Sequence, residues 1–388
     1  MRRFLVGLHQ KMISDILIYA ALFGYSLFCL IMLFGWRRAV YKSRSVGTKT
    51  ENLPEASLII AFRNEEASIP GLINSIRLVV ENSTHWQVFL VNDHSDDRSV
   101  NILSEAAFHS GRVHLLHLPQ EIQGKKRAMQ WGINHAESAY LHFTDADCTF
   151  TLQALNEQLE LLCQSDTHLV CAPVLQYSGN HPAAGMADLE FLSLIGSGLS
   201  FWGLGIPFMA NAAAMGIKKE SFETLGGFKG NEDFPGGDDV FLIEKTRKHF
   251  GAESIRFLSS AVSCIHTEGD QSLSHFLQRR IRWGAKSRAY SGAGKILTLS
   301  VVMLNLIYLL AIGFPIFVDE SMVNPLIIIT LKVLFDSLIL LPVLLRFKQY
   351  RLIPYLIPAS VLYPFYIVFT ALLALAGNYQ WKNRKYKK

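Results

Sequence analysis

The sequence predicts a layered α/β domain flanked by transmembrane helices. Between about residues 53 and 174, short apolar runs alternate with segments of helical periodicity, which is the pattern of α/β layering. Long apolar stretches with few charges lie near both ends of the 388-residue chain. We therefore expect an α/β domain with one N-terminal and about three C-terminal transmembrane helices.

The first apolar stretch, residues 13–34, has Asp15 as its only charge. At about 1.5 Å per residue, it is long enough to cross a hydrocarbon core of about 30 Å. Residues 36–38 (Trp-Arg-Arg) follow it, where a cleaved signal peptide would have small residues. We expect an N-terminal segment at residues 1–12 and an uncleaved transmembrane anchor at residues 13–36.

The second apolar block, residues 296–377, divides into three stretches that are long enough to cross a membrane. They are residues 296–318, 325–345 and 352–376, and a basic tail follows at residues 378–388. Lys332 and Asp336 lie four residues apart in the middle stretch, which predicts an ion pair or a bundle-facing site. Prolines in the last stretch predict a kink or a partly interfacial segment.

Lysines and arginines near these stretches predict the orientation in a membrane. They are concentrated after the first stretch and before the second block, which places the domain at residues 50–290 in the cytoplasm. The basic tail would lie outside the cytoplasm if all three C-terminal stretches cross the membrane. Either the tail is an exception to the charge rule, or one stretch re-enters the membrane without crossing it.

The five cysteines are scattered along the chain, which fits a reducing compartment. The net charge of +5 is concentrated near the spans, which favours anionic lipid over nucleic acid as a partner.

Polar clusters follow the predicted strands at the ends where ligands bind in α/β sheets. The predicted strands are residues 57–62, 87–92, 113–118, 141–144 and 169–174, and the predicted helices are residues 69–76, 99–109, 125–136 and 151–163. Acidic residues occupy segments 63–66, 92–97 and 145–147. Because carboxylates at one edge repel each other unless a cation or a ring of donors lies between them, we expect a ligand site there.

Asp145 and Asp147 end the fourth predicted strand. Alternate residues of a strand point to the same side, so both carboxylates can face the edge of the sheet. A hard divalent cation with oxygen ligands would relieve their repulsion and would also hold phosphate oxygens. The alternative is a strand end that provides an acidic N-cap for the helix at residues 151–163.

Two helix starts carry residues suited to phosphate binding or proton transfer. Gly124 and Lys125 open one helix, where free N–H groups and the helix dipole attract phosphate. Asp238 and Asp239 follow a glycine pair and open another, either as an N-cap or as a general base beside a diphosphate. The strict phosphate-loop and dinucleotide glycine patterns are absent from the sequence.

A basic stretch with an apolar face, residues 276–283, precedes the second apolar block. One interpretation is an interfacial helix whose arginines reach the lipid surface. The other is a set of cationic partners for a diphosphate leaving group.

Taken in order, the motifs between about residues 54 and 290 resemble those of the family 2 inverting glycosyltransferases, which have a GT-A fold and use nucleotide sugars. The matching segments are residues 61–65, 91–97, 124–125, 145–147, 211–228, 237–239 and 279–283. The resemblance therefore implies a GT-A (Rossmann-like nucleotide-diphospho-sugar transferase) domain.

The resemblance also implies a role for particular residues. The nucleotide-sugar ligands would be Phe62, Arg63, Glu65, Asp93, Lys125 and Asp145. The metal ligands would be Asp147 and Asp145, and the catalytic pair would be Asp239, as the base, and Asp238. The diphosphate and acceptor contacts would be Asn211, Arg279, Arg282 and Trp283.

Two residues depart from the family pattern: Asp238 stands where glutamate is commoner, and Arg279 stands where many members have glutamine. The arginine version is similar to ceramide-glucosyltransferase-like enzymes, which carry one N-terminal and several C-terminal membrane spans. This similarity implies a lipid acceptor.

The implied reaction is a metal-assisted single displacement with Mg²⁺ or Mn²⁺. A sugar moves from a nucleotide sugar, with UDP as the expected nucleotide, to a hydroxyl of a lipid or glycan acceptor. We expect an enzyme of the bacterial inner (plasma) membrane. The alternatives are a processive polysaccharide synthase, a nucleotidyltransferase and a catalytically silent membrane scaffold.

Overall fold

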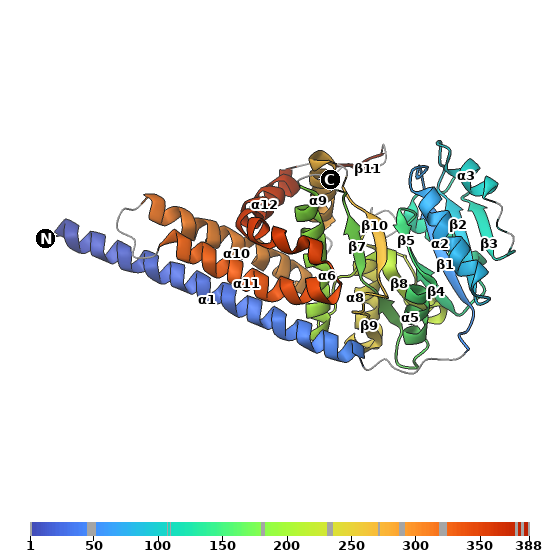
Figure 1. Cartoon of the computed structure of the whole chain (residues 1–388), viewed down its shortest axis with the longest axis horizontal. Helices are drawn as coiled ribbons and strands as arrows, with labels where there is room; N and C mark the ends of the chain where they lie inside the picture. The colour runs from blue at the N-terminus through green and yellow to red at the C-terminus, as the bar shows by residue number, and fades with distance from the viewer. Residues whose placement is uncertain are drawn as a thin grey trace. The chain divides into compact units, whose positions relative to one another are not determined.

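The computed structural model describes residues 2–44, 52–106, 108, 110–179, 183–230, 236–270, 272–286, 292–317, 324–376, 379–381 and 384–386. The chain forms two compact units (Figure 1). The sheet unit comprises Gly35–Tyr177 and Leu194–Gly269. The helical unit comprises Met1–Phe34, Ser178–Ser193 and Asp270–Lys388.

Seven strands form the main sheet of the sheet unit, in the order β3-β2-β1-β4-β8-β6-β9. Their bounds are β1 Ala56–Phe62, β2 Trp86–Asn92, β3 Val113–His117, β4 Tyr140–Phe143, β6 Leu169–Cys171, β8 Met215–Lys218 and β9 Ile255–Phe257. β1 is parallel to β2 and β4, and β8 is antiparallel to both of its neighbours. β1 and β2 are buried along nearly their whole length, as in parallel strands covered on both faces.

A smaller sheet has the order β5-β10-β7, with bounds β5 Cys148–Thr149, β7 Val174–Tyr177 and β10 Ile265–Glu268. The prediction of one strand at residues 169–174 is therefore wrong, because β6 belongs to the main sheet and β7 to the smaller one. Pro173 lies between them, and it has no N–H to continue a ladder.

The helices of the sheet unit are α2 Ile69–Glu81, α3 Ser99–Glu105, α4 Lys125–His135, α5 Leu152–Leu162, α7 Lys219–Thr224 and α8 Asp238–Phe250, together with the later half of α6 Ala184–Gly203 and the end of α1 Arg2–Arg44. The predicted helices at residues 69–76, 125–136 and 151–163 are confirmed. α3 is shorter than the predicted range 99–109, in which residues 107 and 109 lie outside the described part.

The strand ends set the position of the candidate site. Phe62 and Asn92 end β1 and β2 and are partners in the register of the two strands. β4 runs parallel to β1 and ends with Phe143 opposite Ile59. The loops after all three strands therefore leave the sheet at one edge, as the sequence predicts.

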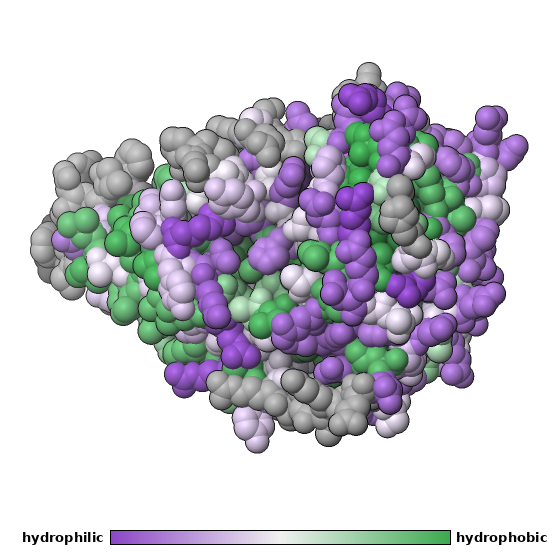
Figure 2. All heavy atoms as spheres, turned by 45° about the vertical axis from the view of Figure 1, so that its right-hand side comes forward, coloured by the Kyte–Doolittle hydropathy of each residue, from purple (hydrophilic) through white to green (hydrophobic). Residues whose placement is uncertain are grey.

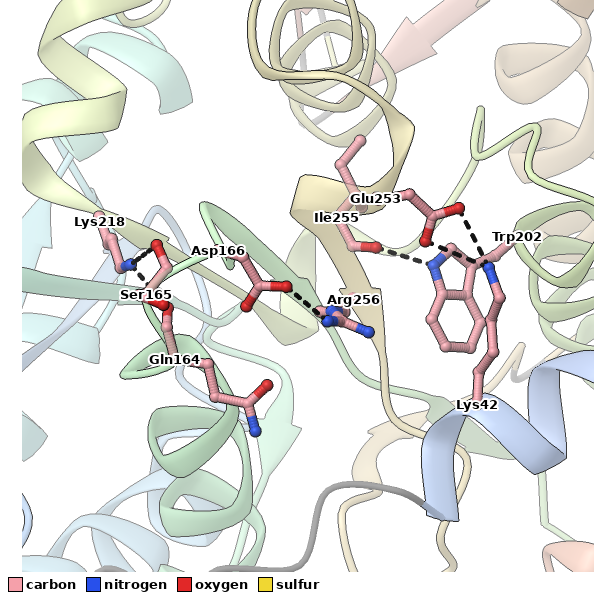
Figure 3. A network of polar contacts seen from close by, with 9 residues as sticks. All are labelled: Lys42, Gln164, Ser165, Asp166, Trp202, Lys218, Glu253, Ile255 and Arg256. Atoms are coloured by element: carbon pink, nitrogen blue, oxygen red, sulfur yellow. Dashed lines mark hydrogen bonds and ion pairs between the residues drawn. The ribbon is translucent and has the colours of Figure 1, made fainter.

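The last turns of α1 pack against the end of α6 within the sheet unit. A Cβ on Gly203 would stand 1.9 Å from the carbonyl oxygen of Gly35, so only glycine fits at this crossing. Beside it, Lys42 lies 3.3 Å from Glu253 and 5.6 Å above the centre of the Trp202 ring (Figure 3). Small residues let two helices approach this closely.

We expect Gly203→Ala to lower the stability of the protein by roughly 1–3 kcal/mol, because overpacking forces α1 away from α6. Gly24→Ala is the matched control on α1, since a Cβ there meets nothing within 4 Å. The unfolding midpoint of the purified protein in detergent measures the effect. Equal midpoints for the two variants would contradict the close crossing.

The helical unit contains α1 up to Phe34, the start of α6, α9 Leu273–Lys286, α10 Gly292–Phe317, α11 Pro325–Arg346, the 3-10 helix Tyr350–Tyr355, α12 Leu356–Ala376, β11 Tyr379–Trp381 and β12 Arg384–Tyr386. Among the described residues, four helical stretches are long and apolar enough to cross a membrane: Ile18–Ser43, Gly294–Gly313, Pro325–Arg346 and Tyr350–Leu373. This agrees with one predicted N-terminal and three predicted C-terminal helices. Figure 2 shows apolar side chains gathered over the helices of this unit.

The predicted ion pair between Lys332 and Asp336 is present, with 2.8 Å between Nζ and Oδ2. Tyr25 of α1 places its hydroxyl 2.9 Å from the same ammonium. The ammonium also lies 5.4 Å from the ring centre of Tyr308 on α10. Because a buried charge needs partners, this cluster ties α1 and α10 to α11.

His142 on β4 is buried, with its ring 5.0 Å from the Trp86 ring. Burial lowers the pKa of His142 to about 3. Above pH 6.5 the imidazole is neutral in the folded and the unfolded chain. Between pH 6.5 and 3 only the unfolded chain binds the proton, so stability falls as the pH falls.

We expect this histidine to cost up to about 1.4 kcal/mol of stability per pH unit below its ordinary pKa. The unfolding midpoint of the wild type should therefore drop between pH 7 and pH 5 more steeply than that of His142→Met. His135→Gln, at an exposed position, is the control and should keep the wild-type slope. The same slope for His142→Met and the wild type would contradict the assignment.

Candidate active site

The loops after β1 and β2 are held together by hydrogen bonds between side chains and backbone. The Asn64 amide donates to Asp96 Oδ1, and its carbonyl oxygen accepts from the Asp96 N–H at 3.0 Å. The Glu65 N–H donates to Ser99 Oγ at 2.8 Å. Asn64 and His94 have φ of 53° and 56°, in the left-handed region that non-glycine residues seldom adopt. Such strain persists where neighbouring contacts fix the loop, and it is common at functional sites.

The residues expected to bind the nucleotide sugar begin at these loops. Phe62 is the buried last residue of β1, and the Arg63 guanidinium donates to the Asp93 carbonyl at 3.1 Å. The Asp93 carboxylate accepts from the Gly124 N–H at 3.0 Å. Asp93 therefore connects the ends of β1 and β2 with the start of α4.

Lys125, the first residue of α4, lies among the predicted carboxylates. Its Nζ is 2.6 Å from Asp145 Oδ1 and 3.4 Å from Asp238 Oδ2. Burial disfavours the charged amine, but the charges of Asp145, Asp238 and Asp147 outweigh it and raise the pKa of Lys125 above its ordinary value. Lys125 is therefore a cation that bridges the carboxylates of Asp145 and Asp238.

Asp145 and Asp147 do not lie on a strand, contrary to the prediction. β4 ends at Phe143, and the two aspartates occupy a turn in which the Cys148 N–H donates to the Asp145 carbonyl at 3.2 Å. The acidic N-cap alternative is also wrong, because Thr151 caps α5 with its own side chain. The carboxylate of Asp145 instead pairs with Lys125.

A cavity of about 180 Å³ lies beside Asp147 and is lined also by Ser68, Gly71, Thr149, Tyr177, His266, Thr267 and Glu268. None of these other residues is expected at the site from the sequence. The pKa of His266 is lowered by burial, so its imidazole is neutral near pH 7 and can act as an acceptor. In the sequence, His266 is one polar residue in a short strand. Local patterns do not distinguish such a residue from an ordinary sheet position.

The residues around this cavity are chemically suited to a divalent cation. Asp147 and His266 both line the cavity, and Asp145 lies two residues before Asp147, so the turn provides hard carboxylate oxygens. Among the described residues, no three histidine, cysteine or acidic side chains are close enough to hold a metal ion by themselves. Water or phosphate oxygens would have to complete the coordination shell.

The two aspartates at the start of α8 have different surroundings. Gly237 occupies the N-cap position with φ of 75°, so Asp238 is not the N-cap. Asp238 is buried and also lies 3.6 Å from Lys126 Nζ. Asp239 is partly exposed, and its Oδ1 accepts from the Val240 N–H at 2.8 Å. Asp238 thus holds the start of α8, and Asp239 is the more accessible carboxylate.

Asn211, expected on the acceptor side, accepts from the Ala213 N–H at 3.0 Å and so caps a short 3-10 helix. The structure gives this side chain a local structural role. A contact with the acceptor stays a prediction.

Arg279, Arg282 and Trp283 lie on α9 of the helical unit, so their approach to the carboxylates stays a prediction. Arg279 is 2.8 Å from the buried Asp270. Trp283 has its ring centre 5.9 Å from the Phe191 ring. The side chain of Arg282 lies outside the described residues.

A family model described as "Glycosyl transferase family 2" matches residues 57–226. These residues are therefore a family 2 glycosyltransferase domain, built on a GT-A-like mixed sheet. The chain is 31% identical over 97 residues to a dolichyl-phosphate beta-glucosyltransferase of Trichomonas vaginalis, covering 24% of this chain and 29% of that protein. It is 31% identical over 101 residues to an undecaprenyl-phosphate 4-deoxy-4-formamido-L-arabinose transferase of an Enterobacter species, covering 26% and 31%. The alignments thus span less than a third of either relative.

A solved structure shares the fold over a longer range. The mannosyltransferase PcManGT of Pyrobaculum calidifontis, in complex with GDP-Man and Mn²⁺, aligns with a TM-score of 0.57 and 15% identity. The alignment covers 91% of this chain and 98% of that one. At this identity the likeness shows the GT-A fold.

Proposed function

We propose that the protein is a membrane-anchored inverting glycosyltransferase. It transfers a sugar from a nucleotide-diphosphate sugar, with UDP as the expected nucleotide, to a hydroxyl of a lipid or glycan acceptor. The observation that carries this proposal is the gathering of Lys125, Asp145, Asp147 and Asp238 at the carboxyl edge of a family 2 domain. The proposed location is the bacterial inner membrane, with the catalytic domain in the cytoplasm.

The chemistry is a single displacement at the anomeric carbon. Asp239 accepts the proton of the acceptor hydroxyl as that oxygen forms a bond to the anomeric carbon. The bond from this carbon to the diphosphate oxygen breaks, and the nucleoside diphosphate leaves with the electron pair. One displacement inverts the anomeric configuration, and no covalent enzyme intermediate is needed.

The other residues bind and orient the donor. Asp93 and Arg63 are proposed to hold the nucleotide, and Lys125 the diphosphate. Asp145 and Asp147 would hold Mg²⁺ or Mn²⁺, which as a Lewis acid stabilises charge on the diphosphate when bound. Mn²⁺ accompanies the nucleotide sugar in the mannosyltransferase structure, which supports a divalent cation here. Arg279, Arg282 and Trp283 are proposed to contact the diphosphate and the acceptor.

A lipid acceptor is supported by the four helices that are apolar enough to span a membrane. The two relatives named for dolichyl phosphate and undecaprenyl phosphate support it as well. Helices of this kind would bring the catalytic domain to the surface where lipid acceptors reside.

Membranes that contain the protein should be incubated with a panel of labelled nucleotide sugars, with and without EDTA. We expect one sugar to move into an organic-soluble product and EDTA to prevent this transfer. A long water-soluble polymer would instead indicate a processive synthase. Absence of any labelled product, with every donor and with both Mg²⁺ and Mn²⁺ supplied, would contradict the proposed function.

A further inference from the structure

The carboxylates of the candidate site already have a cation of their own. Lys125 Nζ lies 2.6 Å from Asp145 and 3.4 Å from Asp238, so one ammonium links the turn after β4 with the start of α8. Lys126 lies 3.6 Å from the other oxygen of Asp238. Asp238 therefore keeps one cationic partner even if Lys125 moves.

The ammonium of Lys125 and a metal ion would compete for Asp145. Carboxylate oxygens bind hard divalent ions at about 2.0–2.6 Å, so an ion on Asp145 would stand a few ångströms from this ammonium. At that distance the repulsion between the two cations weakens metal binding. A diphosphate would relieve it, because phosphate oxygens accept hydrogen bonds from the ammonium.

We propose that Lys125 is an internal counter-ion, displaced from Asp145 when a divalent cation binds and then transferred to the diphosphate of the donor. The inference rests on the proposed function, since it concerns the same cation and the same donor. It makes the binding of the cation and of the nucleoside diphosphate reciprocal, so that each raises the affinity for the other. Neutralising Lys125 should strengthen the binding of the cation and should weaken the effect of the nucleoside diphosphate on that binding.

The test is a titration of the purified full-length protein in detergent with Mn²⁺ alone, in which the free ion is measured by electron paramagnetic resonance. We expect Lys125→Met to bind Mn²⁺ about tenfold more tightly than the wild type, because one nearby positive charge is removed. Lys125→Arg keeps the charge and should keep the wild-type affinity. UDP should tighten Mn²⁺ binding more in the wild type than in Lys125→Met.

Lys219→Met is the matched control, because this ammonium donates to the Ala136 carbonyl at 2.7 Å. It should leave Mn²⁺ binding unchanged. Mn²⁺ affinity that is equal or lower in Lys125→Met would overturn the proposal. If Lys125→Met does not fold, Lys125→Gln tests the same loss of charge. The wild type alone provides a second test, because a Mn²⁺ affinity that does not change when UDP is added would overturn the proposal.

The counter-ion role and the proposed function can fail independently of each other. Sugar transfer in membranes, together with unchanged Mn²⁺ affinity in Lys125→Met, would overturn the counter-ion role and leave the enzyme assignment standing. A tenfold gain in Mn²⁺ affinity with no sugar transferred from any donor would support the counter-ion role and contradict the enzyme assignment.

Discussion

Asp239→Asn should reduce sugar transfer by about 10²- to 10⁴-fold, while the affinity for the nucleotide sugar stays close to that of the wild type. This is the range by which a positioned general base accelerates a reaction. Asparagine keeps the size of the side chain but cannot take the proton of the acceptor hydroxyl. Transfer is measured with the donor that the panel identifies, and donor affinity by equilibrium binding.

Glu244→Gln is the matched control on the same helix. Its carboxylate pairs with Lys248 at 2.6 Å on the surface of α8, so transfer should be unchanged. Asp238→Asn should behave differently from both, because it loosens the contacts of α8 with Lys125 and Lys126 and should lower the stability as well as the rate. Near-normal transfer by Asp239→Asn would show that another group is the base.

The strands β1 to β4 and the edge of the sheet that carries the site could be predicted from the sequence, because both depend on local patterns. Buried strands of a parallel sheet are continuous apolar runs, and polar residues follow each run where the chain leaves the sheet. Phe62 and Asn92, which end two such runs, are partners in the register. The ion pair between Lys332 and Asp336 could be predicted because residues four apart are neighbours on one face of a helix.

The turn at Asp145 could not be predicted, because its cause lies far along the chain. Cys148 begins β5, and β5 pairs with β10 at Thr267. This long-range pairing takes the chain out of the main sheet directly after β4, so the strand rule of alternation no longer applies. For the same reason, two features of the site could not be predicted from local patterns. They are the contact of Lys125 with Asp238 and the position of His266 in the cavity that Asp147 lines.

Asp147→Asn should lower sugar transfer at least 100-fold and weaken Mn²⁺ binding at least tenfold. The substitution removes one negative charge from a cavity wall that otherwise offers Glu268 and a neutral His266. At a few ångströms a unit charge is worth about 1 kcal/mol or more toward a cation, even when screened by water, and a dication doubles this. A loss of 1.4 kcal/mol corresponds to a tenfold weaker affinity.

Asp166→Asn is the control for Asp147→Asn. Asp166 is an exposed carboxylate that pairs with Arg256 at 2.8 Å (Figure 3), and it does not line the cavity. Both variants lose one negative charge, so a general effect of net charge on Mn²⁺ would appear equally in both. Only Asp147→Asn should lose transfer, and excess Mn²⁺ should restore part of it, because weaker binding can be offset by mass action. Equal behaviour of the two variants would remove Asp147 from the proposed cation site.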